Sequence, residues 1–94
     1  MSHFEMKVVD TFQFDNGMTV FLGSVRSQTE PIPASDCELV VGGEVKATIR
    51  IDGEMIVETA DSRYRSVSTS QPINLAAYGV GRSGFIIRDK DWCQ

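Results

Sequence analysis

Residues 4–25 read FEMKVVDTFQFDNGMTVFLGSV and contain two alternating segments on either side of Asp15-Asn16-Gly17. Alternation of apolar and polar side chains is typical of a strand with one buried face. We expect a long strand over 4–14 and a return strand over 18–25, because Asn-Gly tolerates the positive φ angles of a tight hairpin turn. In the first strand the alternation places one set of side chains on the core face, namely Phe4, Met6, Val8, Phe12 and Phe14, and the opposite set on the solvent face, namely Glu5, Lys7, Thr11 and Gln13.

A second hairpin is expected further along the chain. Residues 44–51 alternate without a break across eight positions, and Asp52-Gly53 supplies a tight turn into a partner strand over 54–59. Shorter strands are expected at 36–41, 73–78 and 85–88. We interpret two polar stretches as loops, 26–35 with Pro31 and Pro33, and the serine-rich 60–72.

These elements predict an all-β fold, since no window shows a helical period. A chain of 94 residues with 41% hydrophobic and 23% charged residues suits one globular domain. Six or seven strands spaced by about ten to twelve residues favour a closed sheet without exposed edges. We therefore expect a single small closed barrel of mostly antiparallel strands over residues 1–94.

The formal charge of −4 opposes long-range attraction to phosphate backbones. A nucleic-acid partner would therefore need a local basic patch. The chain shows neither an apolar run near 18 residues nor a basic and then apolar N-terminal stretch, so we expect a cytoplasmic protein without a membrane partner. Cys37 and Cys93 are expected to be reduced thiols. No metal site is expected, because the one histidine, His3, is terminal and structural zinc needs four ligands.

The pattern resembles the second-domain β-barrel of elongation factor Tu and related translation GTPases. The resemblance rests on Val8-Val9-Asp10-Thr11-Phe12 followed by Gly17, Thr19-Val20, Gly23 and Val25, on Asp36-Cys37-Glu38-Leu39-Val40, and on Ile73-Asn74-Leu75 with Gly79 and 88–92. Within this pattern, Asp10 interrupts an apolar face, which indicates a bulge or a carboxylate that caps a turn. Gly23 permits close packing where strands cross.

The resemblance implies a translation-protein-like barrel that binds a protein or an RNA, as such barrels help to hold the acceptor end of charged tRNA. It implies no nucleotide activity here, because the chain lacks a Gly-x-x-x-x-Gly-Lys-Ser/Thr loop. The glycine-rich 79–84 leads into a strand and not a helix, so we interpret it as a turn. We expect no cofactor and no catalysis, since neither the serines nor the cysteines have a histidine base in the fold proper.

The loop Arg63-Tyr64-Arg65 is the best candidate binding site, because two guanidinium groups beside an aromatic ring can grip phosphates or carboxylates while the ring stacks. Arg26 and Arg82 would extend this patch if their loops share one end of the barrel. A solvated loop is the plainer interpretation. A faint likeness of 63–68 to the Arg-x-Tyr-Ser flavin motif is weakened by Arg65, which stands where the stacking tyrosine belongs.

Two further interpretations stay open. The first is a small acidic inhibitor or immunity protein that neutralises a basic protein target through carboxylates, namely Glu38, Glu44, Glu54 and Glu58. The second is a structural domain with no separate ligand. An unclosed sheet edge between Pro31 and Val41 would also let two copies pair as a homodimer.

Overall fold

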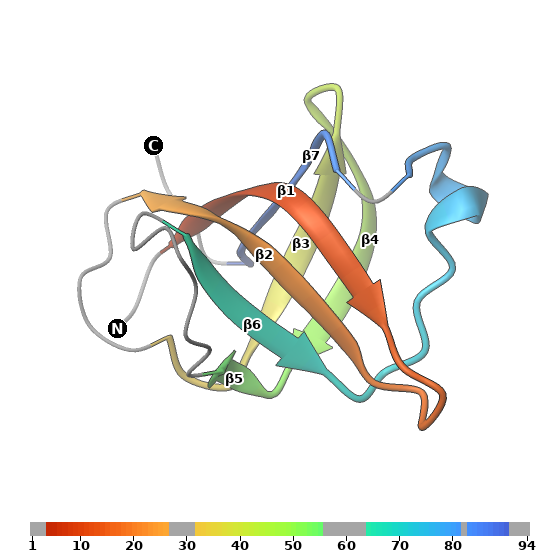
Figure 1. Ribbon diagram of the computed structural model, residues 1–94. Coiled ribbons are helices and arrows are strands. Elements are labelled where there is room, and N and C mark those ends of the chain that lie inside the picture. The colour runs from red at the N-terminus through yellow and green to blue at the C-terminus, as the bar shows by residue number, and fades with distance from the viewer. Residues whose placement is uncertain (1–3, 27–31, 56–63, 82, 91–94) are drawn as a thin grey trace.

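The computed structural model describes residues 4–26, 32–55, 64–81 and 83–90. The described elements are β1 (Glu5–Gln13), β2 (Thr19–Arg26), β3 (Ser35–Val41), β4 (Glu44–Ile51), β5 (Gly53–Met55), β6 (Arg65–Thr69), a 3-10 helix η1 (Leu75–Tyr78) and β7 (Phe85–Asp89). All seven strands join one antiparallel sheet in the order β4-β3-β7-β1-β2-β6-β5 (Figure 1). The predicted all-β, antiparallel class is confirmed.

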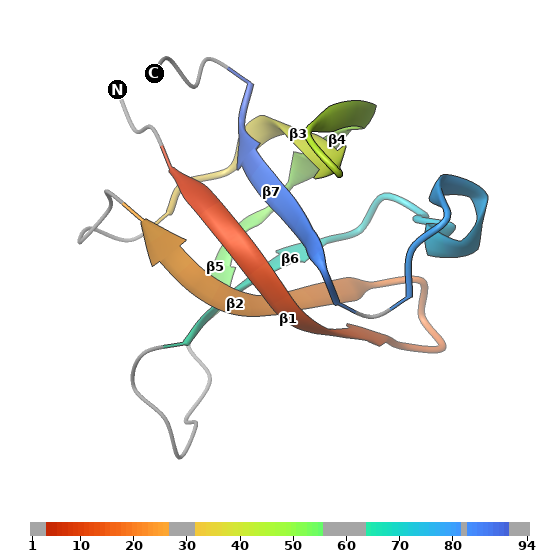
Figure 2. The ribbon, with the colours of Figure 1, turned by 90° about the horizontal axis from the view of Figure 1, so that it is seen from above.

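The sheet is strongly curled and forms an open half-barrel (Figure 1, Figure 2). Its two edges meet at one end, where the Thr69 hydroxyl donates to the Arg50 carbonyl (2.5 Å) and the Arg50 amide donates to Oε1 of Gln71 (2.9 Å). The Asp52 amide also donates to the Ser68 carbonyl (2.7 Å). The prediction of a closed barrel is therefore met in part, by bonds that bring β4 and β6 together at this end.

The concave face of the sheet encloses the hydrophobic core. Phe21 of β2 and Phe85 of β7 meet edge to face at its centre, with ring centroids 5.9 Å apart. Ile73 and Leu75, on the segment that leads into η1, add their side chains to this core. The remaining members come from the segments on either side, namely Phe4, Met6, Val8, Ile32, Cys37, Leu39, Ile49, Ile51, Val67 and Ile87.

Two segments differ from the sequence-based prediction. The serine-rich stretch 60–72 was expected to be a loop, but it contains β6, which pairs with β2 on one side and β5 on the other. Val67 points into the core, and the small serines on the other face still pack, so a polar composition does not exclude a buried strand. The strand predicted at 73–78 is instead η1, which Gly79 ends with a positive φ of 75°.

The predicted hairpin between residues 44–51 and 54–59 is wrong in its described part, and residues 56–59 lie outside the described residues. Only Asp52 separates β4 from β5, which is too short for even a two-residue hairpin loop, and β5 pairs with β6. Asp52 and Gly53 form a corner through which the chain passes from one edge of the sheet to the other. β3 is not a free sheet edge, since it lies between β4 and β7, and a homodimer stays a prediction.

Gly23 permits the close approach of β1 and β2 that its position predicts. A Cβ atom at Gly23 would lie 2.2 Å from the Lys7 carbonyl oxygen, far inside van der Waals contact. The backbone would have to move, because the clashing atom belongs to a paired strand and not to a flexible side chain. Gly23 therefore sets the distance at which β2 crosses β1.

We expect Gly23→Ala to lower the free energy of unfolding by at least about 2 kcal/mol, since the clash with the Lys7 carbonyl forces β1 and β2 apart. Urea denaturation followed by circular dichroism measures this loss. Gly81→Ala is the matched control, because a Cβ atom there meets nothing within 4 Å, and its effect should stay within about 0.5 kcal/mol. Equal urea midpoints for Gly23→Ala and Gly81→Ala would contradict the conclusion that Gly23 sets the distance between β1 and β2.

Candidate functional site

A β-bulge in β1 decides which side chains of the first hairpin reach solvent. Val8 is paired with Gly23 and Asp10 with Leu22, so Val9 is an extra residue that has no cross-strand partner. The Asp10 carboxylate accepts a hydrogen bond from the Thr11 amide (2.9 Å) at this bulge. The bulge that Asp10 indicates in the sequence is therefore present, and it reverses the alternation of every residue that follows it in β1.

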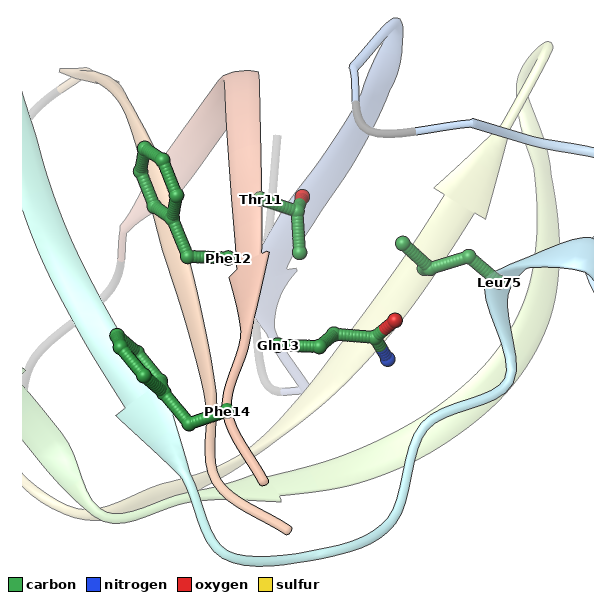
Figure 3. A pocket seen from close by; sticks show the side chains of 5 residues that line it. All are labelled: Thr11, Phe12, Gln13, Phe14 and Leu75. Carbon is green, nitrogen blue, oxygen red and sulfur yellow. The ribbon is translucent and has the colours of Figure 1, made fainter. Parts of the chain in front are cut away.

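Phe12 and Phe14 lie outside the core because of this bulge. Their exposed fractions are 40% and 51%, whereas Thr11, at 3%, occupies the inward position. Figure 3 shows Phe12 and Phe14 on one side of β1, with Thr11 and Gln13 on the other side toward Leu75. The prediction that both phenylalanines belong to the core face is therefore wrong. We call the surface formed by Phe12 and Phe14 the aromatic surface.

The turn at the end of the hairpin holds Phe14 in place. The Phe14 amide donates to the Met18 carbonyl (2.9 Å), and the Gly17 amide donates to the Phe14 carbonyl (3.0 Å). Oδ1 of Asn16 accepts a bond from the Met18 amide (3.0 Å), while Gly17 adopts a φ of 88°. The predicted tight Asn-Gly turn is confirmed, and it presents Phe14 from a hydrogen-bonded scaffold.

A pocket of about 340 Å³ lies beside the aromatic surface (Figure 3). It is lined by Thr11, Phe12, Gln13, Phe14 and Leu75. Nε2 of Gln13 donates to the Ile73 carbonyl (2.7 Å), which ties the hairpin to the segment before η1. The pocket is thus built between two segments about 60 residues apart in the sequence and has both polar and apolar walls.

Of the predicted binding residues, the structure describes the side chains of Tyr64 and Arg65. Nε and Nη2 of Arg65 form a bidentate ion pair with Oε2 and Oε1 of Glu54, at 2.7 and 2.5 Å. The two side chains are only 20% and 18% exposed. Tyr64 is half-buried, whereas Arg63, Arg82 and the side chain of Arg26 lie outside the described residues. A patch that includes all five residues stays a prediction.

The ion pair shifts the pKa values of both Glu54 and Arg65. The hydrogen bonds from Arg65 lower the pKa of Glu54 below its usual value, and the same bonds raise the pKa of Arg65. Oε1 of Glu54 also accepts a bond from the Ile32 amide (3.1 Å), and the Glu54 amide donates to the Ile32 carbonyl (2.9 Å). Arg65 and Glu54 therefore hold the Ile32 segment against the outer edge of β5.

The carboxylates of the acidic-inhibitor hypothesis are also engaged within the chain. Glu38 accepts from Nε of Arg88 (3.0 Å), and Glu44 lies 3.3 Å from Nζ of Lys46. Glu54 pairs with Arg65, and Glu58 lies outside the described residues. Each described member of this set therefore has a cation of its own, which leaves little uncompensated charge at these positions.

Neither a reactive thiol nor a metal site is found in the described part of the chain. Cys37 is a free, fully buried thiol, and desolvation raises its pKa to about 12. No group of three or more His, Cys, Asp or Glu side chains is placed to hold a metal ion among the described residues. None of the described helices is long and apolar enough to cross a membrane.

Comparison of the chain with protein-family models, with curated proteins and with solved structures finds no match. The site is therefore interpreted from its geometry. One sequence signal pointed to it, the polar Asp10 on an apolar face, since a bulge there turns the residues that follow to the opposite face.

We expect Glu54→Gln to lower the free energy of unfolding at pH 7 by about 1–3 kcal/mol, because it removes the carboxylate that forms a bidentate pair with the largely buried Arg65 guanidinium. The pKa of Glu54 is lowered by folding, so its contribution is complete above its usual pKa of 4.5 and is lost as pH falls through the folded-state value. The difference between wild type and variant should therefore shrink in acid.

Chemical denaturation between pH 7 and pH 3 measures that difference. Glu44→Gln is the control, since the Glu44 side chain is 73% exposed and its ion pair lies on the surface. The free energy of unfolding of the Glu44→Gln variant should match that of the wild type at each pH in this range. A difference in the free energy of unfolding between wild type and Glu54→Gln that stays constant with pH would contradict the role assigned to the Glu54 carboxylate.

We expect the Cys37 thiol to resist labelling. In a Cys93→Ser variant at pH 8, the reaction with a disulfide reagent should be at least about a hundredfold slower than in denaturant, because Cys37 is buried and its pKa is about 12. The absorbance of the released thiolate measures the rate. Labelling at comparable rates with and without denaturant would show that Cys37 is accessible.

Proposed function

We propose that this protein is a non-catalytic binding module that docks a protein partner on the aromatic surface of Phe12 and Phe14. The observation that carries the proposal is the bulge at Val9, which turns two phenylalanines out of the core. A regular strand would bury both rings and gain their hydrophobic free energy within the fold. Bulges of this kind commonly re-aim side chains at binding sites.

The chemistry of the surface favours a protein partner. Aromatic side chains are enriched at the centres of protein interfaces, because each buries a large area and has few rotatable bonds. The hydrogen-bonded turn that holds Phe14 further reduces the entropy lost on binding. The adjoining pocket of about 340 Å³ can receive a side chain of the partner.

RNA is the less favoured partner at this surface. Single-stranded nucleic acids stack on aromatic rings, but the sites that bind them also carry cations along the backbone path. No lysine, arginine or histidine occurs between Val8 and Val25, the stretch that contains both rings. RNA binding would instead use the predicted arginine patch, in which the described guanidinium of Arg65 already binds Glu54.

The proposal includes a translation-protein-like barrel as its scaffold. The resemblance through Asp10, Gly17 and Gly23 supports this scaffold, since the bulge, the turn and the close crossing all lie at those residues. The bonds of Arg50 with Thr69 and Gln71 support closure of the half-barrel at one end. The proposed binding role differs from that of the translation barrels, because it rests on Phe12 and Phe14.

The test compares what three tagged forms recover from extracts of their own cells after nuclease treatment. We expect the wild type and Val45→Thr to retain one stoichiometric protein, and the double variant Phe12→Thr/Phe14→Thr to lose it. Removal of two central aromatic anchors typically weakens an interface by about 2 kcal/mol or more, which is roughly thirtyfold. Mass spectrometry quantifies the recovered protein.

Val45→Thr is the matched control, since Val45 is an apolar residue 42% exposed on β4, away from the hairpin. Thermal unfolding should show that all three forms are folded, because Thr is well tolerated in strands. Undiminished recovery of the protein by the double variant would overturn the proposal. Recovery of RNA that nuclease abolishes would favour the arginine patch instead.

A further inference from the structure

We propose that Asn16 is a site of spontaneous deamidation, and that the isoaspartate formed there removes the support of Phe14. The site lies in the turn between β1 and β2, at the tip of the first hairpin (Figure 1). The modification goes beyond the proposed function, because it needs neither a partner nor an enzyme. Only its effect on docking rests on the proposed function.

The reaction is an internal attack on the side-chain amide of Asn16. The Gly17 nitrogen gives up its proton to a solvent base and forms a bond to Cγ of Asn16, while the Cγ–Nδ2 bond breaks and Nδ2 leaves as ammonia with a proton from water. A water molecule then opens the resulting succinimide ring at one of its two carbonyl carbons. Opening at Cγ yields aspartate. Opening at the main-chain carbonyl carbon yields isoaspartate, in which the main chain runs through Cβ and Cγ.

The turn favours this attack in three ways. Asn16 and Gly17 are exposed, so solvent reaches the amide. Gly17 has no side chain to crowd its nitrogen, and even a Cβ atom there would meet nothing within 4 Å. Oδ1 of Asn16 accepts from the Met18 amide (3.0 Å), a bond that folds the side chain back over the Gly17 peptide and polarises the carbonyl toward attack.

One hydrogen bond of the turn opposes the reaction. The Gly17 amide donates to the Phe14 carbonyl (3.0 Å), and this bond has to break before the nitrogen can attack. Exposed loop tips are among the parts of a fold that open at the lowest cost in free energy. The reaction is therefore slow in the folded chain, but it does not require unfolding of the sheet.

The two products have different effects on the hairpin. Aspartate keeps the original main chain and a side-chain oxygen that can accept from the Met18 amide. Isoaspartate adds one carbon atom to the main chain between Phe14 and Met18, the segment that the two backbone bonds of Phe14 enclose. A turn with an additional main-chain atom cannot keep this hydrogen-bond geometry. Phe14 therefore loses its scaffold in the isoaspartyl form, and the aromatic surface loses one fixed ring.

Asn74 provides an internal control, since it is the other asparagine of the chain. It is also exposed, and its side chain forms no cap bond to η1. The residue that follows is Leu75, whose side chain is 7% exposed and packs in the core. Its bulk and its fixed position hinder an attack by the Leu75 nitrogen, so Asn74 should react much more slowly than Asn16.

Ageing of the purified full chain tests the site. The protein is incubated in mildly alkaline buffer, and peptide mass spectrometry follows the exchange of the side-chain NH2 group for OH at both asparagines. We expect Asn16 to convert at least about tenfold faster than Asn74, because glycine leaves the attacking nitrogen uncrowded. Enzymatic methylation of isoaspartate should label the peptide that contains residue 16. Equal rates at the two asparagines would overturn the proposal.

The isoaspartyl form, separated by ion exchange, is then compared with Asn16→Asp by NMR. Asn16→Asp is the matched control, since it adds the same charge without lengthening the main chain. We expect the signals of the Phe14 ring and the Met18 amide to move further from their wild-type positions in the isoaspartyl form than in Asn16→Asp. Identical Phe14 and Met18 signals in the two forms would overturn the effect on the hairpin.

The effect on docking is measured by recovery of the protein partner from nuclease-treated extracts. We expect the isoaspartyl form to recover less of it than Asn16→Asp does. Undiminished recovery by an isoaspartyl form with shifted Phe14 signals would overturn the effect on docking and leave the modification intact. Failure of the proposed function itself would instead appear as undiminished recovery by the Phe12→Thr/Phe14→Thr variant.

Discussion

One extra residue in β1 controls the placement of every side chain on the first hairpin. Since side chains alternate with a period of two, inserting Val9 between two paired positions exchanges the inner and outer faces of the strand beyond it. Met6 and Val8 remain in the core before the bulge, and Thr11 takes the inward place after it. The core geometry, the exposed rings and the proposed interface all depend on this exchange.

The rest of the sheet compensates for a barrel that is open along part of its length. At the edge formed by β5, the Ile32 segment bonds to Glu54, and Arg65 fixes the carboxylate that receives one of those bonds. At the edge formed by β4, side chains of Thr69 and Gln71 occupy the outward peptide groups of Arg50. Such covering of edges protects a sheet against pairing with other chains. Among the described residues, Lys46, Arg50, Arg65 and Arg88 are engaged in ion pairs of this kind.

The sequence predicted those parts of the fold that depend on a few neighbouring residues. The Asn-Gly turn, the strand Glu44–Ile51 and the close crossing at Gly23 depend on neighbouring residues, and each is present in the structure. The pairing of β5 with β6 depends on how the sheet curls, and η1 depends on how Leu75 reaches the core, so neither could be derived from alternation. Asp10 indicated a bulge, but its consequence for Phe12 and Phe14 required the register. Phenylalanine is common both in cores and at interfaces. The pairing register of β1 with β2 therefore decides on which face Phe12 and Phe14 lie.

The energetics explain why the rings alone do not make a complete binding site. If each phenylalanine has about 200 Å² to bury, the part still exposed at 40–51% amounts to roughly 90 Å² per ring. At about 25 cal/mol per Å², burying both rings would contribute roughly 4–5 kcal/mol. Association alone costs an estimated 4–15 kcal/mol in lost translational and rotational freedom, so the rings offset only the lower end of that range. The remaining affinity has to come from groups near the rings, such as those that line the pocket beside Gln13. A surface of this composition binds weakly to apolar side chains in general, and gains both affinity and discrimination when the partner also fills the adjoining pocket.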